Sequence, residues 1–340
     1  MKFPRIDIDL KKISHNVRSI KKLYGSKRIE IIGVTKLICG DPELASVLVK
    51  NGIQILADSR IANIKRMKES GIKAKFMLLR SPAWSEINET IANVDISLNT
   101  EIIVLRQLSK IAVKNNVIHK VILMIEMGDL REGIMPYDID AIVKKVIKLK
   151  GLFLIGIGTN LACFNGEEPN AKKMDELSLI ASHLERKFDI NLAIISGGNS
   201  SNYYWFVSSK TIGRVNNLRI GESFFLGTEP IKGNSISNLY TDAFILVAEV
   251  IESKIKPPKK NKTKKQITKR IIVAIGEQDV LVSGIFPIQS VLIIGASSDH
   301  LVLGCNNCNL NIGDTVSFNL NYKALLRVFN SKYVIRNIIN

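Results

Sequence analysis

The chain has 340 residues, of which 46% are hydrophobic, so it is long enough for one large and one smaller domain and too apolar to be disordered. Four cysteines are too few for a disulfide framework, and there is no apolar run long enough to span a membrane. The N-terminal MKFPRIDIDL lacks the apolar core of a signal peptide, so we expect a cytoplasmic protein that binds no membrane.

The formal net charge of +17 raises the question of nucleic-acid binding. Nine Lys or Arg and no acidic residue lie between Lys254 and Arg270, so this segment supplies much of the excess charge. It contains two prolines and no aromatic residue for base stacking, so we predict a solvated loop and no nucleic-acid partner. Nucleic-acid binding through this segment is the alternative, which a salt-dependent gel shift would test.

Eight apolar runs of strand length alternate with helical patterns in the first two thirds of the chain. The runs are 29–35, 53–57, 74–79, 94–98, 120–127, 152–158, 192–197 and 217–220. The clearest helical patterns between them are 41–52, 59–71, 99–116, 136–151 and 170–188. This order predicts an α/β fold with a parallel (β/α)8 barrel of the TIM type, although a doubly wound open sheet could hold as many strands.

After Gly227 the pattern changes to strands joined by turn residues, without helical patterns between them. We therefore predict a barrel domain over 1–229 and a C-terminal all-β domain over 230–340, with a short N-terminal strand in 1–10 that could join the β domain. The CNNC motif at Cys305 and Cys308 has metal-like spacing but no matching second pair, so we expect a turn and no metal site.

The active site of such a barrel lies at the C-terminal ends of its strands. Polar residues at these ends are Lys36, Arg131, Asn160, Asn199, Ser200, Arg219, Gly221 and Glu222. Lys36 follows a buried strand, where its ammonium either reaches water or is held in a pocket for covalent chemistry. A neutral lysine amine forms Schiff bases with carbonyls, and pyridoxal 5'-phosphate (PLP) is the usual carbonyl partner.

Two glycine-containing segments at adjacent strand ends favour a phosphate. SGGNSSN at 196–202 and RIGES at 219–223 offer backbone N–H groups and hydroxyls next to short helical segments. Phosphate sites after the seventh and eighth strands are frequent in this barrel. Together with Lys36, the two segments indicate a PLP site.

The segments VTKLICG, MGDLREG, GIGTNLACFNG, SGGNSSN and LRIGESFFLG resemble the fold-type III PLP enzymes of the alanine racemase superfamily, and most of all its ornithine (basic amino acid) racemase branch. AIGEQDV, GASSDHLVL and LNYKALL resemble that branch too, so the similarity spans essentially the whole chain. The resemblance implies an isomerase that interconverts L- and D-enantiomers of ornithine or another basic amino acid. It also implies a homodimer whose sites are completed by the partner subunit.

The resemblance assigns roles to single residues. Lys36 is similar to the Schiff-base lysine, which is also one of the two acid/base groups. Arg219 is similar to the arginine that faces the pyridine nitrogen, and Arg131 to the one near the cofactor's phenolic oxygen and the substrate carboxylate. The remaining expected cofactor contacts are the phosphate contacts of Asn199, Ser200, Gly221 and Glu222, the ring contact of Asn160, and Tyr322 in a shared motif.

Three departures from alanine racemases are visible. Gly40 stands where they carry a phosphate-binding tyrosine, and Met124 where they carry a lysine that is often carbamylated. No Ser-Tyr-Gly type motif supplies the second catalytic base. The candidates for that base are Cys163, Asp279, Asp299 and His300, each of which could equally be a turn or packing residue.

A basic substrate needs a partner for its distal ammonium. Acidic candidates on strand-end or loop segments are Asp129, Glu132, Glu222, Asp279 and Asp299. Three alternatives to this function stay open: a racemase of alanine or of broad specificity, a non-enzymatic PLP-homeostasis protein, and a D-threonine aldolase. The extra β domain argues against the second, and a count of only four histidines argues against the metal site of the third.

Overall fold

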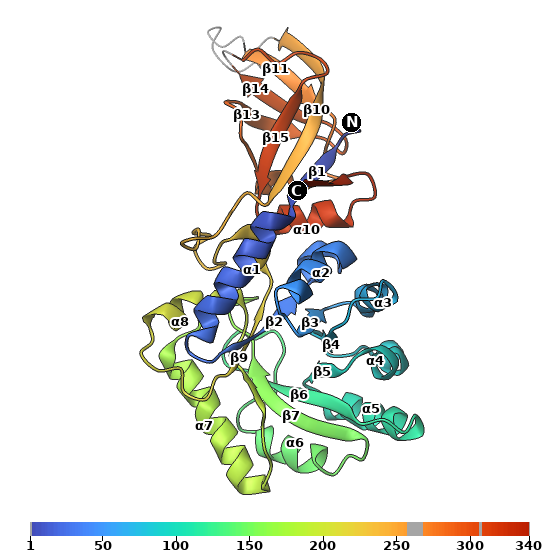
Figure 1. The fold of residues 1–340 in the computed structure, drawn as a ribbon, viewed down its shortest axis with the longest axis vertical. Coiled ribbons are helices and arrows are strands. Elements are labelled where there is room, and N and C mark those ends of the chain that lie inside the picture. Colours follow the sequence, from blue (N-terminus) through green and yellow to red (C-terminus); the bar gives the residue numbers. More distant parts are fainter. Residues whose placement is uncertain (1, 257–267, 306–307, 340) are drawn as a thin grey trace. The chain divides into compact units, whose positions relative to one another are not determined.

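The computed structural model describes residues 2–256, 268–305 and 308–339. The chain forms two compact units. The first, the barrel unit, consists of Ser14–Lys36 and Gly40–Leu239, and the second, the β unit, of Met1–Ile13, Leu37–Cys39 and Tyr240–Asn340. Figure 1 shows the fold with its elements labelled.

The barrel unit is built on eight parallel strands that close into a barrel. In chain order they are β2 (Glu30–Val34), β3 (Ile55–Asp58), β4 (Lys75–Leu78), β5 (Ile96–Asn99), β6 (His119–Ile125), β7 (Leu152–Thr159), β8 (Ile194–Ser196) and β9 (Asn217–Ile220). The ring closes where β9 pairs with β2, with Arg219 opposite Ile32. The predicted (β/α)8 barrel is therefore confirmed.

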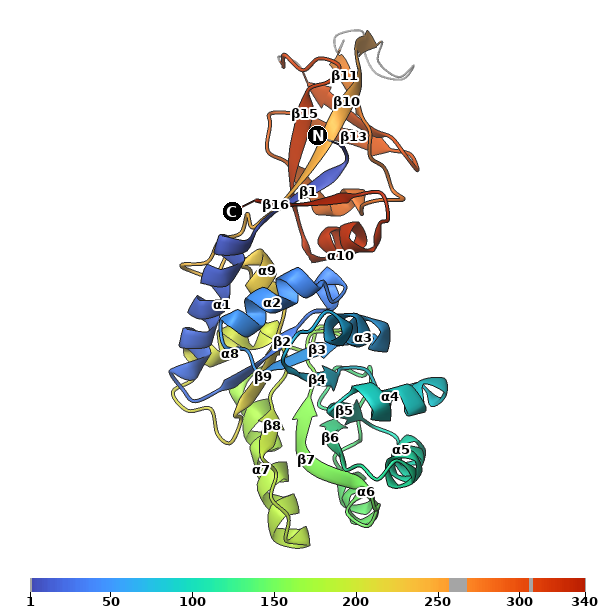
Figure 2. The ribbon, with the colours of Figure 1, turned by 45° about the vertical axis from the view of Figure 1, so that its right-hand side comes forward.

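One helix precedes the first barrel strand and the others follow the strands, and the helices lie around the outside of the barrel (Figure 2). They are α1 (Leu10–Gly25), α2 (Pro42–Lys50), α3 (Ile61–Glu69), α4 (Ile87–Asn93), α5 (Ile102–Lys114), α6 (Ile139–Val146), α7 (Ala171–Phe188), α8 (Tyr203–Ser208) and α9 (Glu222–Leu226). Asp41 caps α2 by accepting the N–H groups of Glu43 and Leu44, as its position before a proline predicts. The helical patterns did not indicate α1 or α4, whereas α8 and α9 are the short helical segments expected beside SGGNSSN and RIGES.

The inside of the barrel is packed with apolar side chains. A buried cluster is formed by Ile32, Val34, Ala57, Met77, Ile96, Leu98, Ile122 and Met124. Met124, which stands where alanine racemases have a lysine, is thus part of the barrel core. Such layers make the interior of the barrel a packed core rather than a pore.

The β unit contains an eight-stranded sheet. Its main path runs β12 (Ile285–Pro287), β15 (Thr315–Leu320), β10 (Phe244–Lys256), β11 (Thr268–Val273), β14 (Leu301–Cys305) and β13 (Leu292–Ala296). β1 (Arg5–Asp9) pairs antiparallel with β10 and parallel with β16 (Ile335–Ile339). The unit also contains α10 (Tyr322–Asn330), which buries Leu325 and Phe329 and which the strand pattern did not predict.

Two sequence features of the β unit differ from expectation. The basic segment is only partly a loop, since β10 extends to Lys256 and β11 begins at Thr268, while 257–267 lie outside the described residues. A disulfide joins Cys305 and Cys308, where we had expected a plain turn. Within the described residues, no helix is long and apolar enough to cross a membrane.

Candidate active site

Lys36 begins a single 3-10 turn directly after β2. The buried hydroxyl of Thr35 donates to Asp58 Oδ2 over 2.8 Å, at the end of the neighbouring strand β3. Asp58 Oδ1 accepts from Asn63 Nδ2 and from the Arg60 N–H, both at 3.0 Å. Burial raises the pKa of Asp58. A buried carboxyl group therefore fixes the backbone that precedes Lys36, a role that we had not predicted.

Gly40 closes the turn after Lys36. Its N–H donates to Thr35 O over 3.0 Å, and its φ of +61° lies in the left-handed region that glycine tolerates. A Cβ at this position would lie 2.7 Å from Asn63 Cβ. A larger side chain at position 40, such as the tyrosine that the resemblance to alanine racemases implies, would therefore clash with Asn63 on this backbone.

Arg219 on β9 is 3% exposed and its guanidinium is held by three acceptors. Nη2 donates to Thr159 O over 2.7 Å and to Asn160 Oδ1 over 2.6 Å, and Nη1 donates to Ser196 Oγ. Burial lowers the pKa of Arg219 to about 10, so it stays protonated at neutral pH. Nε donates to no acceptor among the described residues.

Arg131 and Glu132 lie in the loop after β6 and form a bidentate ion pair. Arg131 Nη2 donates to Glu132 Oε1 over 2.6 Å, and Nε donates to Oε2. Glu132 Oε1 also accepts from Asn160 Nδ2 over 3.0 Å. The hydrogen bonds that Arg131 donates to the Glu132 carboxylate raise the pKa of Arg131. Because Asn160 binds both Glu132 and Arg219, one chain of contacts links the two arginines.

Asp129, in the same loop, supports the neighbouring loop after β7. Its Oδ1 accepts the N–H groups of Cys163 and Phe164 at 3.0 Å and of Asn165 at 3.3 Å. Its Oδ2 is buried without a partner among the described residues. A carboxylate that is enclosed in this way holds the loop and is not open to a substrate.

The segment after β8 is held by Asn199. Its Oδ1 accepts the Ser201 N–H over 2.8 Å, and its Nδ2 donates to Leu161 O over 3.1 Å and to Cys163 Sγ over 3.3 Å. Asn199 thereby caps the 3-10 turn Ser200–Asn202 and ties it to the loop that carries the exposed thiol of Cys163.

Gly221 and Glu222 mark the start of α9. A Cβ on Gly221 would lie 2.9 Å from Val34 O, so the end of β9 approaches β2 closely. Burial raises the pKa of Glu222 to about 7; Glu229 adds to this effect and Lys36 opposes it. Lys36 and Glu222 therefore lie close enough at the strand ends to interact electrostatically.

The remaining predicted residues lie in the β unit. Asp299 is exposed between β13 and β14, where hydrogen bonds from His300 and from nearby serines lower its pKa. Tyr322 begins α10, and Asp279 is buried and accepts from Ser331 Oγ over 2.8 Å. Across the described ranges, no group of three or more His, Cys, Asp or Glu side chains is arranged to hold a metal ion.

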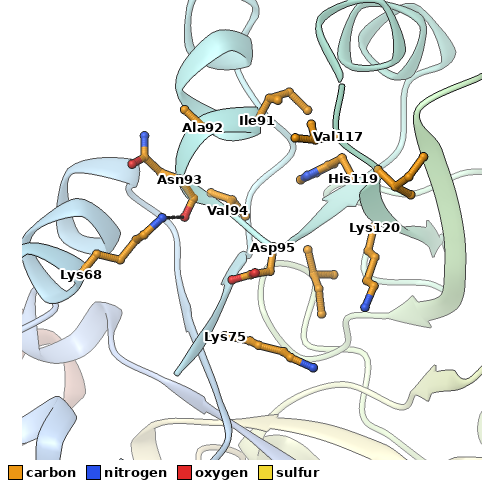
Figure 3. A pocket seen from close by; sticks show the side chains of 12 residues that line it. Lys68, Lys75, Ile91, Ala92, Asn93, Val94, Asp95, Val117, His119 and Lys120 are labelled. Carbon is orange, nitrogen blue, oxygen red and sulfur yellow. Dashed lines mark hydrogen bonds between the residues drawn. The ribbon is translucent and has the colours of Figure 1, made fainter. Parts of the chain in front are cut away.

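A cavity of about 350 Å³ lies at the opposite, N-terminal ends of β4, β5 and β6 (Figure 3). Charged side chains from Lys68, Lys75, Asp95 and Lys120 line it, and Lys68 Nζ donates to Asn93 O over 3.1 Å. These side chains form no network of the kind seen at the other end. In TIM-type barrels this end serves stability, so the candidate site is the polar C-terminal end.

Comparisons with known proteins establish the family of the chain. Residues 8–229 match the family "Alanine racemase, N-terminal domain", and the chain belongs to this family. It is 36% identical to an ornithine racemase from Acetoanaerobium sticklandii, over 99% of this chain and 100% of that protein. It is also 36% identical to a lysine racemase from Thermotoga maritima, over 98% of both chains.

Solved structures share the fold at low sequence identity. An alanine racemase from Streptomyces coelicolor has a TM-score of 0.81 at 15% identity, over 99% of this chain and 98% of that one. A D-threonine aldolase from Filomicrobium marinum has a TM-score of 0.80 at 14% identity, over 99% of this chain and 91% of that one. Since both fall below 25% identity, they establish the fold and no more.

Proposed function

We propose that this chain is a PLP-dependent racemase of a basic amino acid, with ornithine as the first candidate and lysine or arginine next. The observation that carries the proposal is the set of polar residues at the C-terminal strand ends, with Lys36 and two linked arginines. Family membership and two full-length relatives named as ornithine and lysine racemases support the reaction and the substrate class.

The residues at this end fit PLP. Lys36 Nζ makes no hydrogen bond to a described residue and follows a fixed strand end, as a covalent attachment point requires. Arg219 Nε is an N–H without a protein acceptor, which suits the pyridine nitrogen. Ser200 and the N–H groups of Gly221 and Glu222 would hold the phosphate. When bound, PLP supplies the electron sink that makes the α-hydrogen of an amino acid acidic.

The chain's own residues divide the remaining work. The Nζ of Lys36 takes or returns the α-proton on one face of the substrate. Arg131 holds the α-carboxylate through its guanidinium. Arg219, as a buried cation, opposes protonation of the ring nitrogen and so limits the electron sink. For the opposite face, Cys163 at the strand ends and Asp299 of the β unit stay the candidate proton donors.

The geometry narrows the choice of partner for the distal ammonium. Asp129 is enclosed by backbone N–H groups, and Glu132 is engaged by Arg131 and Asn160. Glu222, Asp279 and Asp299 stay as candidates. A charge-assisted hydrogen bond to one of them contributes about 1.5–3 kcal/mol, which corresponds to about ten- to a hundredfold discrimination against alanine.

The test is kcat/KM for both enantiomers of ornithine, lysine, arginine, alanine and serine, with chirality-sensitive detection. We expect the basic amino acids to exceed alanine by about tenfold or more. Faster turnover of alanine than of every basic amino acid would refute the specificity. Aldehyde release from D-threonine would indicate the aldolase, and PLP binding without any turnover the non-enzymatic carrier.

The active unit that we propose is a homodimer in which the β unit of one subunit completes the site of the other. The β unit carries the candidate acid/base residues Asp279, Asp299 and His300 and the candidate cofactor contact Tyr322, which a dimer would bring into use. Mixing an inactive Lys36→Ala protein with an inactive variant of the β unit should restore part of the activity through hybrid sites. Full activity from a monomer at low concentration would argue against this arrangement.

A further inference from the structure

We propose that Glu132 is a positioning residue that holds Arg131 ready for the substrate's α-carboxylate and couples it to Arg219 through Asn160. This inference rests on the proposed function and deepens it, because it names the group that prepares the carboxylate site. It also gives Glu132 a role other than binding the distal ammonium.

The contacts define this role directly. The two N–H donors on one edge of the Arg131 guanidinium, at Nε and Nη2, donate to the Glu132 carboxylate. The same carboxylate accepts from Asn160 Nδ2 at 3.0 Å, and Asn160 Oδ1 accepts from Arg219 Nη2 at 2.6 Å. A planar guanidinium that is held at two nitrogens has its orientation fixed, and its other edge remains available to a carboxylate.

Arg131 needs a contact that fixes its conformation, because its long side chain is 38% exposed. Ordering a free arginine side chain costs conformational entropy. On β6, the strand that leads into this loop, Met124 is apolar and buried in the barrel core, so it offers no charge. Glu132 is the acidic residue that the structure places on Arg131.

The loop itself fixes the direction of Glu132. Glu126 Oε1 accepts the N–H groups of Gly128 at 2.6 Å and of Leu130 at 3.0 Å. The loop returns to β6 where Ile134 N donates to Met124 O over 2.8 Å. Because backbone and side chains are held on both sides of the ion pair, Arg131 is pre-organised before a substrate arrives.

The decisive variant is Glu132→Gln, which keeps the shape but removes the charge and sets an amide N–H against Arg131. We expect KM for ornithine to rise about ten- to a hundredfold with a smaller change in kcat, as for a lost charge-assisted contact. The second ligand is 1,4-diaminobutane, which is ornithine without its carboxylate. Its inhibition constant should change less than twofold, because it does not use Arg131.

A readout independent of turnover comes from ligand-induced thermal stabilisation of the PLP-loaded protein. Ornithine should raise the Tm of the Glu132→Gln protein less than that of the wild type, while 1,4-diaminobutane should raise both equally. In an Arg131→Lys background, Glu132→Gln should add little, since the two residues act together. The matched control is Glu185→Gln on α7, which breaks a similar pair with Arg214 and should leave all these values unchanged.

Two outcomes would overturn the inference while the wild type still racemises. One is a Glu132→Gln protein in which neither the KM for ornithine nor the inhibition constant of 1,4-diaminobutane changes. The other is an equal loss for both ligands, which would reveal a general structural defect instead of a carboxylate site. A wild type that racemises no amino acid would refute the proposed function itself, so the two failures are distinguishable.

Discussion

Both ends of the barrel carry charged side chains but organise them differently. At the N-terminal ends, Lys68, Lys75 and Lys120 surround an open cavity, and Asp95 accepts a backbone N–H of β4. At the C-terminal ends, hydrogen bonds connect Arg131 to Arg219 through Glu132 and Asn160.

We infer from this difference that the active site lies at the organised end and not at the cavity. Surface lysines around a cavity have many conformations and are screened by solvent. A buried arginine with three acceptors has one conformation, and it costs stability unless every contact is made. The organised end is therefore where we expect chemistry, and the open end is where we expect only effects on stability.

The largest expected effect separates the lysines of the two ends. Lys36→Ala should lower kcat by about 10⁴-fold or more, the upper range for an acid–base group, because it also removes the covalent attachment point. Lys75→Ala at the other end is the matched control and should stay within about twofold of the wild type. Both are measured as initial rates of ornithine racemisation. Equal losses in the two variants would remove the distinction between the ends.

A second effect concerns the charge at Arg219. Arg219→Glu should favour a proton on the ring nitrogen and deepen the electron sink, giving a new long-wavelength absorption band when substrate is added. Racemisation should slow by about 10²–10³-fold, as for loss of a preorganised electrostatic group. Arg219→Lys keeps the positive charge and should show no such band. An unchanged spectrum and rate in the Glu variant would mean that Arg219 does not face the ring nitrogen.

The smallest effect is on stability and belongs to the N-terminal end. His119 is buried beside Ser97, with Nε2 2.8 Å from its Oγ, and burial lowers the pKa of His119 to about 4. In the unfolded chain, His119 binds a proton as the pH falls below its ordinary pKa near 6.5. In the folded chain, His119 binds that proton only near pH 4. Folding should therefore lose about 3 kcal/mol over this range.

His119→Gln cannot titrate and should lose this part of the pH dependence without changing kcat. The measurement is the free energy of unfolding in urea at pH 7 and at pH 4.5 for both proteins. Parallel losses in wild type and variant would show that other groups cause the acid sensitivity.

The fold was predictable because each strand and several helices carry local patterns. The apolar runs at 29–35 and 120–127 are bounded by turn residues and became β2 and β6. α10 was missed because its amphipathic pattern follows a series of strands, and short helices such as α9 span too few residues to show periodicity.

Part of the candidate site was also predictable, since Lys36, Asn160 and Arg219 stand directly at strand ends. The contact of Glu132 with Arg131 and Asn160 was not, because it depends on a loop in which Leu130 adopts a φ of +54°. The hydrogen bond from Thr35 to Asp58 joins the ends of two consecutive strands across 23 positions of sequence. Such contacts follow from the folded backbone and leave no spacing signal.

The most direct test of the account asks which lysine carries the cofactor. The wild-type protein is loaded with PLP, reduced with borohydride, digested with trypsin and analysed by mass spectrometry. The modification blocks cleavage at the modified lysine, so we predict a single PLP-bearing peptide, 29–50, that contains Lys36. Recovery of the cofactor on Lys68, Lys75 or Lys120, or on no lysine at all, would contradict the assignment of the C-terminal strand ends as the active site.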